Sequence, residues 1–246
     1  MRLLILAALL ASACAFAQNE SESGKSAIPA PVMGAAPPAV AADQRVTMYP
    51  GTNPVVAGKS GVPQFQVDPF WPKPLPNNWI LGQVSGVAVD KRGHVWIIQR
   101  PRSLAEREAG AQQNPPWSKC CYAAPPVMQF DQAGNLLRAW GGSGAGYEWP
   151  AVEHGIFIDD NDFVWTAGSG SKDSQILKFT LDGKFVLQIG KSGQSKGSND
   201  TANLGSLADI NVDTAAKEVY VADGYRNRRV IVFEDRKSTR LNSSHT

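Results

Sequence analysis

The chain has 246 residues, of which 43% are hydrophobic and 19% charged, a balance that excludes a collagen-like or wholly disordered protein. Its 24 basic and 22 acidic side chains give a formal charge of +2 without any block of about five or more Lys or Arg, so we predict no nucleic-acid partner. Arg2 carries +1 and residues 235–246 carry +2, so the sequence between them is slightly acidic.

The first seventeen residues have the form of a secretory signal peptide. Arg2 precedes an apolar run over residues 3–10, and Ala15-Phe16-Ala17 forms a cleavage site before Gln18. We therefore expect a secreted or periplasmic protein. Acylation of Cys14 in a lipoprotein is the alternative, but the Leu that usually lies three residues before such a cysteine is Ala11 here. The run is too short to cross a bilayer, and we predict no transmembrane segment.

Residues 18–65 are rich in Ala and Pro and have few aromatic residues. Such a composition buries too little apolar surface to offset the entropy of ordering the backbone. We predict a disordered tether with no function of its own.

Three later segments repeat one pattern, in which two strands with alternating apolar residues are joined by a tight polar turn. These pairs span residues 86–90 and 94–100, residues 155–159 and 163–167, and residues 209–213 and 218–223. Further strands follow at residues 127–131 and 136–140, at residues 176–179 and 184–189, and at residues 229–233. Trp96 and Trp165 hold equivalent positions and are predicted to lie in the core.

Four strands in each unit of roughly forty or more residues predict an all-β fold, a β-propeller over residues 66–234. Two blades would be complete, and the third would lack its last strand. Closed propellers have about 4 to 8 blades, so we expect about half of a propeller.

Common catalytic motifs are absent from the sequence. The glycine-rich run at residues 141–146 lacks the spacing of a nucleotide-binding loop and is predicted to link two blades. The acidic run at residues 159–162 falls at a hairpin turn, where Asp and Asn are favoured for local reasons. Histidines occur only at positions 94, 154 and 245, too far apart in sequence for a local zinc pair or triad.

Four segments, in order, resemble the lyase domain of peptidylglycine α-amidating enzymes. They are residues 81–90, Ile97-Ile-Gln-Arg100, Glu153-His-Gly-Ile156 and residues 221–229, within a match of roughly residues 80 to 234 whose repeats resemble NHL repeats. The resemblance implies a six-bladed propeller with a zinc ion held by three histidines of different blades and a calcium ion nearby. It also implies cleavage of a peptidyl-α-hydroxyglycine to a peptide amide and glyoxylate.

By this resemblance Arg100 and Tyr225 match the catalytic Arg and Tyr, and His154 matches a zinc ligand. The backbone carbonyls of Val87 and Ile156 match calcium ligands. Simpler roles stay open, because Arg100 could be a solvated charge at a strand end, Tyr225 an exposed turn residue and His154 a packed strand residue. His94 lies in a hairpin turn and is predicted to have no role.

Asp223, Asn227 and Arg229 form a D-x-x-x-N-x-R motif, one residue longer than the D-x-x-N-x-R of NHL repeats, and are predicted to tie the turn to neighbouring strands. Two features depart from the resembled family. The other zinc histidines would follow Phe233, and Arg226 replaces a disulfide-bonded Cys of the animal enzymes.

Cys120 and Cys121 lie in a Pro-rich insertion between the second and third strands of the first blade. In an exported protein, adjacent cysteines indicate a vicinal disulfide or intermolecular pairing. Residues 235–246 have lost the apolar pattern and look like the translation of a sequencing adapter, so we predict a non-native tail; a natural polar tail is the alternative.

These observations predict an exported, monomeric, zinc- and calcium-dependent lyase acting on a peptide or small acyl-hydroxyglycine, of which this chain is an inactive N-terminal part. The first alternative is a non-catalytic NHL propeller that serves as a binding or scaffold module. The second is a calcium-dependent sugar-lactone hydrolase, which would need acidic and Asn ligands that the sequence does not place.

Overall fold

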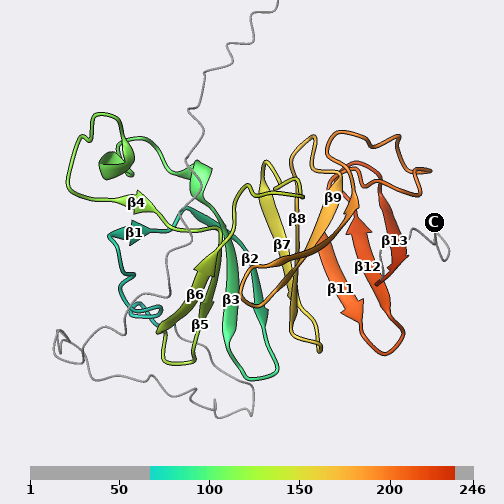
Figure 1. Cartoon of the computed structure of the whole chain (residues 1–246), viewed down its shortest axis with the longest axis horizontal. Coiled ribbons are helices and arrows are strands. Elements are labelled where there is room, and N and C mark those ends of the chain that lie inside the picture. Colours follow the sequence, from blue (N-terminus) through green and yellow to red (C-terminus); the bar gives the residue numbers. More distant parts are fainter. Residues whose placement is uncertain (1–66, 236–246) are drawn as a thin grey trace, which may run out of the picture.

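The computed structural model describes residues 67–235, which fold into antiparallel sheets arranged side by side (Figure 1). The predicted signal peptide, the predicted tether and all of the predicted tail except Asp235 lie outside these residues. The two complete sheets have four strands each, and their first strands, together with that of the third sheet, lie next to one another. This arrangement is that of propeller blades, which confirms the all-β fold class.

The first blade follows the predicted order, with a shifted start. Its first strand begins three residues before the predicted Gly86 and ends at Val89, because the Asp90 carboxylate accepts the amides of Arg92 and His94 and so forms the turn. The strands, in hydrogen-bonded order, are β2 (Gln83–Val89), β3 (Val95–Arg100), β5 (Val127–Phe130) and β6 (Leu136–Trp140).

The second and third blades also follow the predicted order, and the third has three strands as predicted. The second contains β7 (Glu153–Ile158), β8 (Phe163–Gly168), β9 (Gln175–Thr180) and β10 (Phe185–Gly190), and the third contains β11 (Asp209–Asp213), β12 (Glu218–Asp223) and β13 (Arg229–Glu234).

Equivalent aspartates and tryptophans organise the first two blades. Trp96 Nε1 donates to Asp90 Oδ2 at 3.0 Å, and Trp165 Nε1 donates to Asp159 Oδ2 at 2.8 Å. Both indole rings are fully buried, as predicted. Asp159 also accepts the amides of Asn161 and Phe163, so the acidic run is a hairpin turn.

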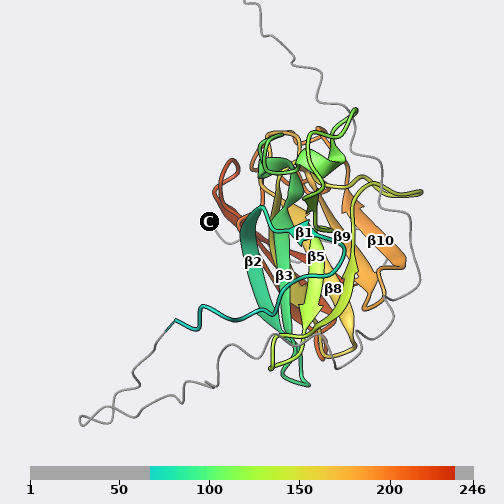
Figure 2. The same cartoon turned by 90° about the vertical axis from the view of Figure 1, so that its left-hand side faces the viewer.

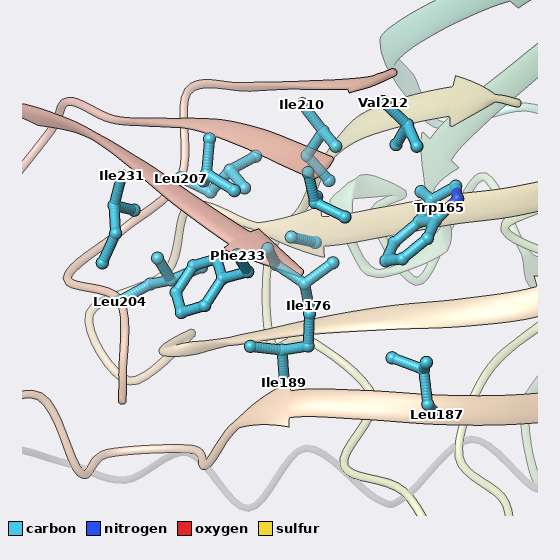
Figure 3. Packing of buried hydrophobic residues seen from close by; sticks show 13 residues of the cluster. Trp165, Ile176, Leu187, Ile189, Leu204, Leu207, Ile210, Val212, Ile231 and Phe233 are labelled. Atoms are coloured by element: carbon cyan, nitrogen blue, oxygen red, sulfur yellow. The ribbon is translucent and has the colours of Figure 1, made fainter. Parts of the chain in front are cut away.

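The core lies between the faces of neighbouring blades. Trp96 and Ile98 of the first blade meet Ile156 and Leu177 of the second. Trp165 and Ile176 of the second meet side chains of the third, and Figure 3 shows this cluster. Burying a large apolar side chain contributes about 1.5–3 kcal/mol, so these two interfaces hold the blades together.

One region was not predicted from the sequence. The strands β1 (Trp79–Ile80) and β4 (Tyr122–Ala123) pair in parallel, and the segment carrying β1 crosses the outer face of the first blade (Figure 2). The Pro-rich insertion, at its predicted place between β3 and β5, contains η2 (Pro101–Ser103), η3 (Gly110–Gln112) and a disulfide between Cys120 and Cys121.

The outermost faces keep apolar side chains exposed. Val87 and Val89 of β2 are 66% and 62% exposed, and Tyr220 and Val230 of the third blade are 39% and 48% exposed. Side chains alternate across a strand, so the buried neighbours Val219 and Val221 point toward the second blade and Tyr220 points away from it.

Candidate active site

Three side chains from three different blades meet at one end of the sheets. Arg100 is the last residue of β3, His154 is the second residue of β7, and Tyr225 lies in the turn between β12 and β13. They line a pocket of about 490 Å³. Its lining residues are Arg100, His154, Ser169, Ser171, Ser206, Tyr225 and Arg226.

Arg100 is fixed by hydrogen bonds on three of its N–H groups. Its Nε donates to the backbone carbonyl of Glu153 at 2.8 Å, and its Nη1 contacts Gln83 Oε1 at 3.3 Å. Its Nη2 lies 3.2 Å from His154 Nδ1. Arg100 therefore bridges the first two blades, rather than being only a solvated charge at a strand end.

The contact with Arg100 determines the tautomer of His154. A guanidinium group has donors and no acceptor, so Nδ1 must accept and the proton of the neutral ring is on Nε2. Nε2 lies 3.1 Å from Tyr225 Oη and donates to it. Burial, and secondarily the Arg100 cation, lower the pKa of His154, while Asp209 acts in the opposite direction. The ring is therefore neutral at neutral pH.

Tyr225 presents its hydroxyl group to the pocket. Its side chain is 59% exposed, and its ring meets that of His154 edge to face with centroids 5.4 Å apart. Its backbone amide donates to the carbonyl of Ser206 at 3.3 Å. Because Oη accepts one hydrogen bond from His154, the rest of its hydrogen-bonding capacity remains available to a bound molecule.

The turn that carries Tyr225 is held by the D-x-x-x-N-x-R motif. Asp223 Oδ2 accepts from Asn227 Nδ2 at 2.7 Å and from Arg229 Nε at 3.0 Å. Asp223 Oδ1 accepts the amides of Gly205 and Ser206. The predicted structural role of these three residues is confirmed, and it extends to the Ser206 carbonyl that anchors Tyr225.

Glu153 is a buried acidic residue beside the site that the sequence analysis did not single out. Its side chain is 1% exposed, and Oε1 accepts from Arg102 Nη2 at 3.0 Å and Trp149 Nε1 at 2.9 Å. Oε2 has no hydrogen-bond partner within the described residues, and burial raises the pKa of this carboxyl group. The only signal in the sequence was an acidic residue at the start of a strand that is apolar from Gly155 onward.

The described residues alone do not fit a zinc site. No three His, Cys, Asp or Glu side chains gather around one point in residues 67–235. Zinc needs about four ligands, whereas both nitrogens of His154 already face Arg100 and Tyr225. His94, predicted to have no role, contacts Asp90 and Gln129 at the opposite hairpin.

The predicted calcium ligands occupy equivalent places. Val87 pairs with Ile97, and Ile156 pairs with Thr166, on the first strands of adjacent blades. Each of these strands is at the edge of its sheet in the described part of the chain. Calcium takes about 6–8 oxygen ligands, so two carbonyls cover only part of such a site.

Comparison with curated proteins shows that the chain is similar in sequence to a distant relative. No family model matches the chain. A probable peptidyl-alpha-hydroxyglycine alpha-amidating lyase of Caenorhabditis elegans is 25% identical over 156 residues, which cover 63% of this chain and 42% of the relative. The chain therefore spans less than half the length of that relative.

Solved structures resemble the chain only remotely. A nidogen/laminin complex is 12% identical with a TM-score of 0.43, covering 65% of this chain and 48% of that one. A gluconolactonase of Xanthomonas campestris is 14% identical with a TM-score of 0.33, covering 57% of this chain and 35% of that one. Likeness at this level assigns no function. Residues 67–235 contain no helix with the length and hydropathy needed to cross a bilayer.

Proposed function

We propose that the chain is part of a lyase that cleaves a peptidyl-α-hydroxyglycine to a peptide amide and glyoxylate. One observation carries the proposal: Arg100, His154 and Tyr225, far apart in sequence and on three blades, meet in one pocket. The distant amidating-lyase relative supports the same chemistry.

The reaction requires loss of a hydroxyl proton and cleavage of a carbon–nitrogen bond. Tyr225, as its phenolate, takes the proton from the α-hydroxyl group. The oxygen electron pair forms the carbonyl of glyoxylate, and the electrons of the breaking bond go to the amide nitrogen. Tyr225 then returns the proton to that nitrogen, which regenerates the phenolate.

His154 and Arg100 would orient this step. The Nε2–H of His154 donates to the phenol oxygen and holds it toward the pocket. Arg100 keeps His154 in the required tautomer and has N–H groups left for the substrate. A positioned base of this kind contributes about 10²–10⁴ in rate.

The proposal includes further blades that complete a propeller with NHL-like repeats. The exposed faces with Val87 and Val89, and with Tyr220 and Val230, are the surfaces that such blades would cover. The 42% coverage of the lyase relative is consistent with additional blades.

Metal ions and export belong to the same proposal. His154 would be one zinc ligand through Nδ1, in place of its contact with Arg100 Nη2, while its Nε2–H would still donate to Tyr225 Oη. The other zinc ligands would come from residues outside 67–235, and the carbonyls of Val87 and Ile156 would contribute to a calcium site. Zinc, when bound, would act as a Lewis acid on the substrate oxygen. Metal analysis of the purified full-length protein and N-terminal sequencing for a start at Gln18 test these two points.

The lyase activity is tested with α-hydroxyhippurate and the full-length gene product. We expect glyoxylate release that Tyr225→Phe reduces at least about 100-fold, the lower range for loss of a general base. Tyr122→Phe is the matched control, because Tyr122 lies on β4 outside the pocket and its hydroxyl group has no hydrogen-bond partner within the described residues. Absence of turnover in the folded, metal-loaded wild type, or equal activity of both variants, would refute the proposal.

A further inference from the structure

The pocket has a strong excess of positive charge. Two of its lining residues, Arg100 and Arg226, are cations, three are serines, and no carboxylate lines it. Asp209, the acidic group that interacts with His154, is exposed on β11 and is not part of the lining. An uncompensated cationic pocket favours an anionic ligand.

Of the two cations that line the pocket, Arg226 is the one without a hydrogen bond or ion pair in the described part of the chain. It follows Tyr225 in the turn before β13, its side chain is exposed, and within residues 67–235 it makes no hydrogen bond or ion pair. The next arginines of the turn differ from it: Arg229 is buried and bonded to Asp223, and Arg228 is exposed but does not line the pocket. Arg226 alone of these is free to bind a molecule in the pocket.

Arg100 has donors to spare. A guanidinium carries five N–H groups, and the three contacts to Glu153, Gln83 and His154 leave two of them free. Ser171, exposed at the same pocket and without a hydrogen-bond partner in the described part of the chain, adds a hydroxyl donor. The free donors of Arg100, Arg226 and Ser171 therefore face one space.

We propose that Arg226 and Arg100 form a carboxylate-binding site, and that Arg226 makes the pocket specific for ligands with a free carboxylate. Guanidinium groups bind carboxylates through paired, charge-assisted hydrogen bonds, which are stronger than neutral ones. The identification of the ligand as the α-carboxylate of the substrate rests on the proposed function. The proposal that this site binds a carboxylate does not depend on that function.

The test measures binding rather than turnover, so it is independent of the lyase activity. Hippurate, which lacks the reactive hydroxyl group, is titrated calorimetrically into the wild-type chain, and hippuramide serves as its uncharged counterpart. The variants are Arg226→Gln, Arg226→Lys and the matched control Arg228→Gln, which removes an exposed positive charge two residues away and outside the pocket.

We expect Arg226→Gln to weaken hippurate binding about tenfold or more, the effect of losing one charged hydrogen-bonding group. Arg226→Lys should bind with intermediate affinity, because lysine keeps the positive charge but lacks the paired N–H donors of a guanidinium group. Arg228→Gln should bind like the wild type, and hippuramide should bind all four proteins equally weakly.

Three results would overturn the inference: no hippurate binding to the folded wild type, equal losses in Arg226→Gln and Arg228→Gln, or equal affinity for hippurate and hippuramide. Arg226-dependent hippurate binding, together with no glyoxylate release from α-hydroxyhippurate by the full-length gene product, would keep the carboxylate site and refute only the lyase proposal.

Discussion

The turn between β12 and β13 carries two kinds of side chain that differ in burial and bonding. Asp223, Asn227 and Arg229 are buried, and they bond to one another. Tyr225 and Arg226 lie between them in sequence, are exposed and line the pocket.

Within seven residues, the turn therefore contains a buried set of side chains that stabilise the fold and an exposed set that can bind a ligand. The buried set fixes the backbone, also through Arg229, which donates to the carbonyls of Ser198, Asp200 and Asn203. The exposed set adds little to folding and is therefore free to meet a ligand. Substitutions in the two sets should then change different properties.

Asp223→Ala should have the largest effect on stability. It leaves the buried Arg229 guanidinium without its carboxylate and leaves the amides of Gly205 and Ser206 without an acceptor. Breaking a buried charge pair costs about 3–5 kcal/mol, which we expect as the loss in free energy of unfolding measured with denaturant.

Asp213→Ala is the control for Asp223→Ala. Asp213 also caps a turn, accepting the amides of Ala215 and Ala216, but it is exposed. Its loss should cost about 1 kcal/mol. Similar losses for both aspartates would contradict the assignment of Asp223 to the scaffold.

The repeated strand pattern predicted the blades and their order, because alternating apolar residues must face a neighbouring sheet. It also placed Trp96 and Trp165 in the core correctly. Strand ends were less predictable, since the start of β2 at Gln83 depends on pairing with Arg100.

The candidate site was only partly predictable. Resemblance selected Arg100, His154 and Tyr225, but their contacts depend on how three blades pack, which no local pattern encodes. Arg226 was not predicted to line the site, and Glu153 was not predicted to be a buried carboxyl group beside it, for the same reason. The pairing of β1 with β4 joins residues about forty positions apart and had no periodic signal.

The buried carboxyl group of Glu153 should make the stability of the protein depend on pH. Burial raises the pKa of its carboxyl group from the ordinary 4.5, so the folded state keeps a proton that the unfolded state has already lost. Stability should therefore fall as the pH rises from about that ordinary value through the raised one. Urea unfolding between pH 4 and pH 8 measures this slope.

Glu153→Gln should remove that slope, because an amide does not ionise in this range and its oxygen still accepts from Arg102 and Trp149. Glu148→Gln is the control for losing one negative charge, since Glu148 is exposed. A slope that persists in Glu153→Gln would assign it to another group.

The smallest expected effect is on the protonation of His154. Burial is the larger cause of its lowered pKa and Arg100 the second, so Arg100→Gln should raise the pKa only part of the way toward the ordinary 6.5. A lowered histidine pKa means that the folded state resists protonation, so its contribution to stability is present above pH 6.5 and declines as the pH falls. NMR titration of the ring, with His154→Gln to assign the signal, measures this pKa.

Tyr225→Phe tests which of its two neighbours, Arg100 or Tyr225, orients the His154 ring. It removes the acceptor at Nε2 and leaves Arg100 at Nδ1, so the pKa should stay low and the Nε2–H tautomer should persist in the nitrogen chemical shifts. An unchanged pKa in Arg100→Gln, or a loss of the tautomer in Tyr225→Phe, would mean that Tyr225 rather than Arg100 orients the ring. Tyr225 would then have a structural role of its own. The residues of its turn would no longer divide into a buried structural set and an exposed functional set.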